Sequence, residues 1–176
     1  SLLAVRDINH KYIVVERGRQ KMRAVILSLD TGAYKAKADV AAAASLKRML
    51  EQVGIEVRAA KAFPEDKEML KTVLCKLADA GMAELVLTTG AVGFLEKHCA
   101  PDAVRETADR LLPGIPEALR AYNLRHTKKV ILDRSEAGIR KKTLMINLPE
   151  SAKMAKEDLE YILPEVVQVV DTFSLR

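Results

Sequence analysis

The sequence contains no tryptophan and only seven other aromatic residues, four tyrosines and three phenylalanines, among 176 residues. With so few aromatic side chains, we do not expect a surface that stacks the bases of single-stranded nucleic acid. Cysteine is also rare. Cys75 and Cys99 are too few for the framework of a small disulfide-stabilised domain, and they favour a reducing compartment. We therefore expect a cytoplasmic protein.

Long apolar runs are absent as well. No run approaches the roughly 18 residues that would indicate a membrane span, and we see no signal-like segment at the start. Hydrophobic residues make up 49% of the chain and charged residues 30%, which is typical of a globular protein. The length predicts about one domain, so we expect no membrane partner and one main core.

The net charge of +5 is unevenly distributed. Residues 1–23 hold six Lys or Arg and two acidic residues, and residues 125–142 hold seven basic and two acidic residues. The other residues hold 16 basic and 20 acidic side chains, a net charge of −4 that partly offsets these two stretches. A duplex-binding protein usually has a basic face with a recognisable reading element, which we do not find. We therefore expect no nucleic-acid partner, and the basic stretch at 125–142 favours a small anionic ligand. Its run Arg140–Lys142 is either a solvated face or part of an anion site.

Short apolar runs alternate with segments of helical period from residue 24 onward. The runs expected to be strands are Ala24–Leu29, Ile55–Ala60, Glu84–Thr89, Val130–Leu132 and Thr143–Leu148. Apolar spacing predicts helices around residues 46–53, 70–77, 101–112 and 115–125, and a last helix capped by Ser151. Pro164 is expected to kink or restart that last helix.

Strands that are apolar on both faces and alternate with helices predict an α/β fold with a mainly parallel sheet covered on both sides. We assign this domain to residues 23–176. Residues 1–22 stand outside the alternation and form an N-terminal arm or strand, in which Tyr12–Val15 has strand character and Gly18 lies in a turn. This arm is either an ordered segment, for example against a neighbouring subunit, or the remnant of an upstream domain.

The segments after the strands are the places to look for a site, because ligands of open α/β sheets bind outside the carboxyl ends of the strands. The richest is residues 87–93, which read Leu-Thr-Thr-Gly-Ala-Val-Gly. Hydroxyl groups and glycines there allow close backbone approach to a phosphate or a polar ring. His98 and Cys99 have no partners at metal-ligand spacing, so we predict no resident metal site from them.

Three further segments support a ligand site at the ends of the strands. They read Pro-Gly-Ile-Pro-Glu-Ala-Leu-Arg at 113–120, Ala-Gly-Ile-Arg at 137–140, and Thr-Leu-Met-Ile-Asn-Leu-Pro at 143–149. In this order they resemble the molybdopterin-binding family of molybdenum-cofactor biosynthesis, of the MogA/MoaB type. That family reads TTGGTG, a DVTPE/D element, PGI-x-EA-x-R, and AGIR-x-x-TL-x-INLPGSP. The resemblance covers about residues 23–173. It implies a three-layer αβα sandwich, a homotrimer or hexamer, and molybdopterin as ligand.

The resemblance also implies site residues. Those matching ligand-binding positions are Asp30, Thr88, Thr89, Gly90, Ala91, Val92, Gly93, Ser135, Gly138, Asn147, Pro149 and Ser151. Those at catalytic positions are Glu65, Asp66, His98 and Asp102. In the adenylyltransferase branch, a nucleotidyltransferase-like reaction moves AMP from ATP with Mg²⁺ onto the pterin phosphate. There, carboxylates at such positions would serve magnesium.

Four substitutions fall on the ligand loops. Ala91 replaces a glycine, where its methyl group disfavours a positive φ, and Val92 replaces a hydroxyl residue. His98 replaces an acidic residue and is a poor ligand for magnesium, which prefers oxygen. Glu150 replaces a glycine and would repel a phosphate if it pointed inward. These changes predict a sound fold with an altered site.

Three functions remain open. The first is molybdopterin binding in cofactor biosynthesis, with AMP transfer from Mg-ATP weakened or absent. The second is a catalytically inactive family member that acts as a binding or regulatory interaction module. The third is a relocated site for a different nucleotide, against which unchanged thermal stability with ATP or GTP would count. Loss of pterin binding on changing Gly90 would favour the first.

Overall fold

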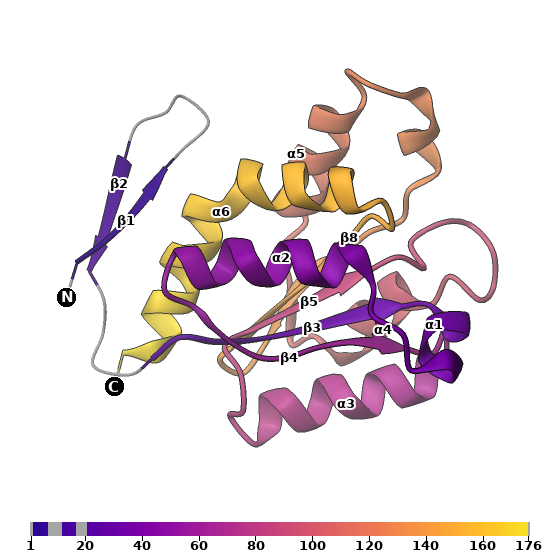
Figure 1. The fold of residues 1–176 in the computed structure, drawn as a ribbon, viewed down its shortest axis with the longest axis horizontal. Helices are drawn as coiled ribbons and strands as arrows, with labels where there is room; N and C mark the ends of the chain where they lie inside the picture. Colours follow the sequence, from indigo (N-terminus) through magenta and orange to yellow (C-terminus); the bar gives the residue numbers. More distant parts are fainter. Residues whose placement is uncertain (1, 7–11, 17–20, 176) are drawn as a thin grey trace.

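The computed structural model describes residues 2–6, 12–16 and 21–175, with a six-stranded sheet at its centre (Figure 1). Its strands lie in the order β4 (Glu56–Phe63), β3 (Arg23–Leu29), β5 (Leu85–Thr89), β8 (Thr143–Leu148), β7 (Ala137–Arg140) and β6 (Arg110–Leu111). The first four are parallel, whereas β7 runs antiparallel to β8 and β6 antiparallel to β7. The predicted mainly parallel sheet is confirmed.

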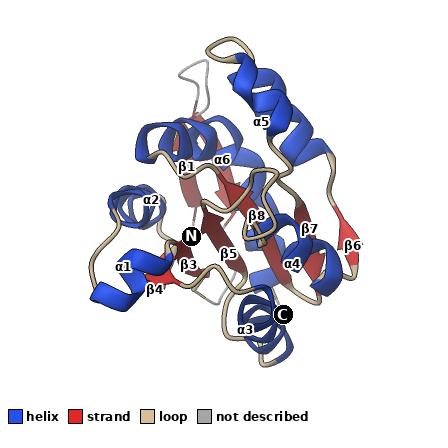
Figure 2. Cartoon of the chain, turned by 90° about the vertical axis from the view of Figure 1, so that its right-hand side faces the viewer, coloured by secondary structure: helices blue, strands red, loops and turns tan. Residues whose placement is uncertain are grey.

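Helices cover both faces of this sheet (Figure 2). The helices are α1 (Thr31–Ala36), α2 (Ala41–Gln52), α3 (Lys67–Asp79), α4 (Ala100–Thr107), α5 (Gly114–Asn123) and α6 (Ala152–Ser174), with a 3₁₀ helix η1 (Lys128–Leu132). Side chains of α2, α5 and α6 join one hydrophobic cluster, and those of α3 and α4 join the other. This confirms the three-layer sandwich. In the part of the chain described, no helix is both long and apolar enough to cross a membrane.

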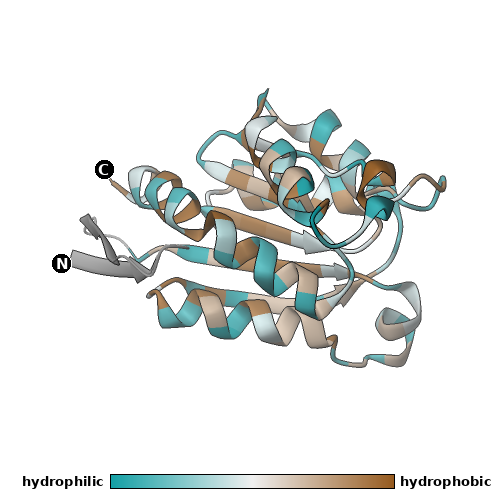
Figure 3. Ribbon diagram, turned by 90° about the horizontal axis from the view of Figure 1, so that it is seen from above, coloured by the Kyte–Doolittle hydropathy of each residue, from teal (hydrophilic) through white to brown (hydrophobic). Residues whose placement is uncertain are grey.

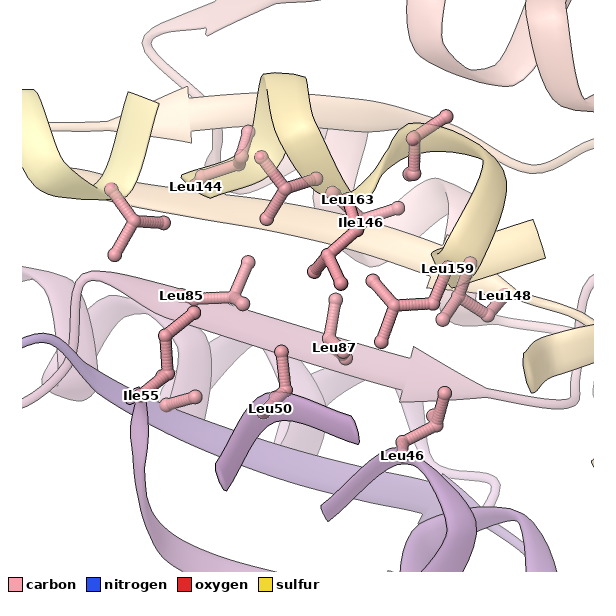
Figure 4. Packing of buried hydrophobic residues seen from close by; sticks show 14 of the residues in the cluster. Leu46, Leu50, Ile55, Leu85, Leu87, Leu144, Ile146, Leu148, Leu159 and Leu163 are labelled. Carbon is pink, nitrogen blue, oxygen red and sulfur yellow. The ribbon is translucent and has the colours of Figure 1, made fainter. Parts of the chain in front are cut away.

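Alternation along the strands builds the two clusters. Leu85 and Leu87 of β5 face α2 and α6, while Val86 between them faces α3 and α4. Figure 4 shows Leu46 and Leu50 of α2 directed toward these leucines of the sheet. In Figure 3 brown segments run along the strands beneath helices in which teal and brown alternate. Because both faces are buried, the strands read as apolar runs.

Two predicted elements were wrong. The helix expected over 101–112 ends at Thr107, and the following residues extend so that Arg110 and Leu111 pair with β7. The strand expected at Val130–Leu132 is the 3₁₀ helix η1, in which only Val130 is buried and Ile131 is 73% exposed. A three-residue apolar run is too short for its period to distinguish these states. The strand in this part of the chain is Ala137–Arg140 instead, between β8 and β6, and its glycine concealed it.

The predicted helix ends are largely confirmed. Gly54, which follows α2, has φ +82°, and Pro101 lies in the first turn of α4. The Oγ of Ser151 caps α6 by accepting from the backbone N–H of Met154 at 3.4 Å. Helix α6 continues through Pro164 without a restart, although Figure 1 shows its axis turning along its length.

A separate hairpin precedes the sheet. Strands β1 (Leu2–Arg6) and β2 (Tyr12–Glu16) pair antiparallel and lie beside α6 (Figure 1). The predicted strand at Tyr12–Val15 is therefore confirmed, whereas Gly18 lies outside the described residues. In the described part of the chain this hairpin does not join the six-stranded sheet. A domain boundary at residue 22 stays a prediction.

Candidate functional site

The strand order places the candidate site at the carboxyl edge of the sheet. The chain leaves β3 toward β4 on one side and reaches β5 on the other, so the topology switches direction between β3 and β5. Ligands of doubly wound sheets bind outside the carboxyl ends of the strands at such a point. Figure 2 looks onto this edge, where the loops after β3, β4, β5 and β8 meet.

Gly90 joins the ends of three strands. It has φ +80°, and its N–H donates to the carbonyl of Leu148 at 3.0 Å. A Cβ at this position would lie 3.1 Å from the carbonyl oxygen of Leu29 and 3.7 Å from the Cβ of Glu150. The position therefore requires glycine for both conformation and space.

Ala91 shares the left-handed conformation but has a side chain. Its φ is +55°, and its carbonyl accepts from the N–H of Ala100 at 3.2 Å, which ties the loop to α4. The substitution noted in the sequence therefore keeps the backbone shape that glycine favours, with a methyl group strained in it.

The two threonines that end β5 bond to neighbouring strands. Thr89 donates to the Oγ of Ser28 at 2.8 Å, and the Oγ1 of Thr88 accepts from the Nδ2 of Asn147 at 2.8 Å. All four side chains are buried. The Oδ1 of Asn147 also accepts from the N–H of Glu136 at 3.0 Å. This network fixes the ends of β3, β5 and β8 against one another.

Two of the predicted carboxylates are helix caps. The Oδ1 of Asp30 accepts from the N–H of Ala33 at 2.9 Å at the start of α1. The Oδ1 of Asp66 accepts from the N–H of Met69 at 3.0 Å at the start of α3. Carboxylates at such positions satisfy backbone donors that the helix leaves open.

The other predicted carboxylates have partners too. Asp102 faces Arg134, with oxygen–nitrogen distances of 2.7 and 3.4 Å. The Oε2 of Glu65 lies 3.9 Å from the Nζ of Lys97, and its Oε1 is 3.4 Å from the hydroxyl oxygen of Thr31. All of these groups lie near the carboxyl edge, but each is already paired.

The loop of residues 90–93 after β5 is the glycine loop, and His98 is directed at it. A Cβ on Gly93 would lie 2.6 Å from the Nδ1 of His98, which also accepts from the N–H of Leu95 at 3.2 Å. Across residues 2–6, 12–16 and 21–175, no three His, Cys, Asp or Glu side chains gather as a metal site would need. The donors that the resemblance implies for Mg²⁺ therefore do not fit a magnesium site. Burial also raises the pKa of the neighbouring Cys99 thiol, which weakens it as a nucleophile.

A cavity of about 230 Å³ lies beside the glycine loop. It is lined by four residues of the predicted set: Val92, Ser135, Asn147 and Pro149. Ser135 is held by Asp133, whose Oδ1 accepts from its N–H at 3.1 Å and from its hydroxyl at 2.6 Å. The structure thus brings the loop and the segments 133–135 and 147–149 to one hollow.

Gly138 and the basic run lie away from this hollow. A Cβ on Gly138 would lie 2.7 Å from the Cβ of Ala108, so packing explains this glycine and its ligand role stays a prediction. Arg140 sits at the turn between β7 and β8, at the opposite edge of the sheet, where it donates to Asp79 at 2.9 and 3.0 Å. The run Arg140–Lys142 therefore lies away from the candidate site, and its role as an anion site stays a prediction.

Two residues that we did not predict line the same cavity. Asn123 ends α5 and Asp158 lies on α6, and the Nδ2 of Asn123 donates to the Oδ2 of Asp158 at 3.0 Å. Burial raises the pKa of Asp158 to about 7. A signal was present in the sequence, because Asp158 lies three residues after Ala155 and four before Ile162, on the buried stripe of the helix.

Comparisons with known proteins agree with this geometry. A family model described as a probable molybdopterin binding domain matches residues 25–168. A molybdopterin adenylyltransferase of Helicobacter pylori J99 is 35% identical over 107 residues, which cover 61% of each protein. That of Escherichia coli K12 is 39% identical over 98 residues, or 56% of this chain and 50% of the relative. The matched segments thus span about half to three fifths of these relatives.

Solved structures extend the similarity over most of the chain. The molybdopterin biosynthesis enzyme MoaB from Thermus thermophilus is 33% identical with a TM-score of 0.78, covering 87% of this chain and 96% of that one. MoaB from Pyrococcus furiosus, a tungsten cofactor synthesizing protein, is 25% identical with a TM-score of 0.74, covering 89% and 98%. The chain belongs to the molybdopterin-binding domain family of the MogA/MoaB type.

Proposed function

We propose that this chain binds molybdopterin in molybdenum-cofactor biosynthesis, and that transfer of AMP from Mg-ATP to the pterin is weak or absent. Family membership supports the binding half, together with relatives whose name is molybdopterin adenylyltransferase. The arrangement of carboxylates supports the second half.

The observation that carries the binding half is the junction of the glycine loop with the cavity. Val92 belongs to the loop and also lines the cavity, so one ligand can contact both. Gly90 and Gly93 would hold the phosphate end through the close approach that glycine allows. Thr88 and Thr89 would hold the loop in place for it through their buried hydrogen bonds. Asn147 and Ser135 would contact the part of the ligand that enters the cavity.

The reduced transfer follows from the state of the acidic groups. Transfer of AMP needs charge stabilisation on the moving group, commonly by a metal held by carboxylates. Here Asp30 and Asp66 cap helices, and Asp102 is paired with Arg134. His98, which stands where the family has an acid, packs on Gly93. None of these groups is poised to bind Mg²⁺.

The test is a calorimetric titration with molybdopterin in buffer containing Mg-ATP, followed by assay of the mixture for adenylylated product. We expect saturable binding and little product. Turnover near that of a known adenylyltransferase measured in parallel would contradict the second half. Saturable binding that disappears in Gly90→Val supports the first half.

Gly81→Val is the matched control for Gly90→Val. Both glycines have a positive φ, +61° at Gly81 and +80° at Gly90, but a Cβ on Gly81 would meet nothing within 4 Å. The backbone strain is therefore shared while only Gly90 lies at the site. Loss of binding in both variants would indicate unfolding, and retention in both would refute the assigned loop. No binding by the native chain would favour the interaction-module alternative.

We also propose assembly into a homotrimer or larger oligomer, as the family resemblance implies. Exposed apolar side chains are available for such contacts, among them Ile131 at 73% and Leu132 at 51% exposure. Sedimentation velocity is expected to show a species of at least three chains, and a monomer at micromolar concentration would contradict this.

A further inference from the structure

The cavity beside the glycine loop contains an acidic group that neither the fold nor the loop explains. Its walls are largely apolar, with Val92 at the loop, Leu119 from α5, Val130 from η1 and Met154 from α6. Asn123 and Asp158 line the same space, with exposed fractions of 5% and 1%. A buried carboxylate in an apolar hollow requires a partner, because its desolvation is unfavourable.

Each of these two side chains has one unused oxygen. The Nδ2 of Asn123 donates to the Oδ2 of Asp158 at 3.0 Å. Throughout the described residues, the buried side-chain atoms without a hydrogen-bond partner are the Oδ1 of Asn123 and the Oδ1 of Asp158. Buried acceptors are nearly always satisfied in folded proteins. Two such acceptors on one hydrogen-bonded pair, both in cavity-lining residues, indicate that donors come from a ligand.

The size of the space limits what that ligand presents. A cavity of about 230 Å³ is smaller than the roughly 300–1,000 Å³ typical of whole drug-sized ligands. It suits one flat ring system whose remaining groups extend past Val92 toward the glycine loop. Apolar walls favour the faces of such a ring, and the two oxygens favour an edge with neighbouring N–H donors.

We infer that this cavity recognises a 2-amino-4-oxopyrimidine ring edge, with the open oxygens of Asn123 and Asp158 accepting the ring N3–H and the 2-amino hydrogens. This edge is common to pterins and to guanine. The inference rests on the proposed function, because molybdopterin is a pterin, and it assigns the specificity for that ring to two residues on α5 and α6.

The charge of the cavity agrees with this assignment. Burial raises the pKa of Asp158 to about 7, the negative charges of Asp133 and Glu157 raise it too, and the hydrogen bond from Asn123 opposes them. Lys129 also lines the cavity. A ring that donates hydrogen bonds favours the carboxylate form. Affinity is therefore expected to rise between pH 6 and pH 8, with proton release on binding.

The experiment compares three small probes by equilibrium titration at pH 8, namely 6-hydroxymethylpterin, guanosine and lumazine. Lumazine has the pteridine ring with an oxo group in place of the 2-amino group, so it presents an acceptor where the cavity requires a donor. We expect it to bind at least ten-fold more weakly than the pterin. A pterin preference over guanosine identifies the pterin as the source, and the reverse identifies guanine.

The decisive variant is Asp158→Asn, which has the same shape but replaces an acceptor by a donor. It is expected to weaken pterin binding at least ten-fold and to remove the pH dependence of affinity. The control is Glu160→Gln, the same charge change at an exposed position of α6, with affinity unchanged. Val92→Phe, at the partly exposed mouth of the cavity, should also block the ring and keeps the test valid if Asp158→Asn misfolds.

The outcomes separate this inference from the proposed function. If molybdopterin binds the native chain and Asp158→Asn equally well, the ring assignment is overturned while the proposed function stands. Equal binding of lumazine and the pterin also overturns it. If molybdopterin fails to bind but guanosine binds and is lost in Asp158→Asn, the ring assignment stands and the proposed function falls. If neither molybdopterin nor any of the three probes binds, both the ring assignment and the proposed function fall.

Discussion

The two sides of the candidate site use their acidic residues differently. At the starts of α1, α3 and α4, Asp30 and Asp66 cap helices and Asp102 pairs with Arg134. On the side of α5 and α6, Asp158 has one hydrogen bond from Asn123 and keeps an oxygen without a partner. The first group stabilises the fold, whereas the second is held in an unfavourable state. A carboxylate's position near a ligand loop is therefore weaker evidence of function than its lack of a partner.

The largest expected effect is on the pH dependence of stability at Asp158. Its pKa is about 7 in the folded chain against an ordinary value of 3.8, so the folded state holds a proton that the unfolded state has released. Stability should therefore fall as pH rises from about 4 to about 7, and remain lower above that. At about 1.4 kcal/mol per pKa unit, the loss reaches up to about 4 kcal/mol.

Calorimetric unfolding of the native chain and of Asp158→Asn between pH 4 and pH 8 measures this effect. The variant has no such proton to lose, so its stability relative to the native chain should increase from about pH 4 to about pH 7 and then level off. Glu160→Gln should follow the native profile. Parallel profiles for the native chain and Asp158→Asn would show that Asp158 titrates normally and would remove the contrast between the two sides.

A smaller effect is expected at Asp66 on the opposite side. Asp66→Ala removes the cap of α3 and should lower the free energy of unfolding by about 1 kcal/mol. Asp66→Asn keeps a capping oxygen without the charge, so its stability should stay close to that of the native chain. Urea unfolding measures both. Equal losses in the two variants would show that the charge, not the cap, is what the chain uses there.

Much of the scaffold was predictable because both faces of the sheet are buried. Runs such as Ala24–Leu29 and Thr143–Leu148 are apolar throughout, and Gly54 and Ser151 mark helix ends by backbone chemistry that acts locally. The errors fell where tertiary pairing decided the conformation. Leu111 fits a helical stripe, but its backbone pairs with Gly138 of β7, and no local pattern around Leu111 indicates that pairing.

The site was predictable in part, through the loop after β5. Gly90 and Asn147 were found because their neighbours follow a recognisable order along the chain. The engagement of Asp102 by Arg134 could not be read from the sequence, since 32 residues separate the two. Asn123 and Asp158 were missed for a similar reason. They lie 35 positions apart in the sequence, and their hydrogen bond joins two different helices.

The smallest expected effect concerns Ala91, where the loop keeps a glycine conformation without glycine. Ala91→Gly relieves the strain of φ +55° but adds flexibility to the unfolded chain, so a net gain of about 0.5–1 kcal/mol is expected. Ala103→Gly, in the interior of α4, should change stability in the opposite direction by about 1 kcal/mol. Thermal unfolding distinguishes the two. If Ala91→Gly also binds molybdopterin more tightly, its methyl group obstructs the ligand as well as straining the backbone. If only stability changes, the obstruction arises elsewhere in the loop, and Glu150 beside Gly90 is the group to shorten next.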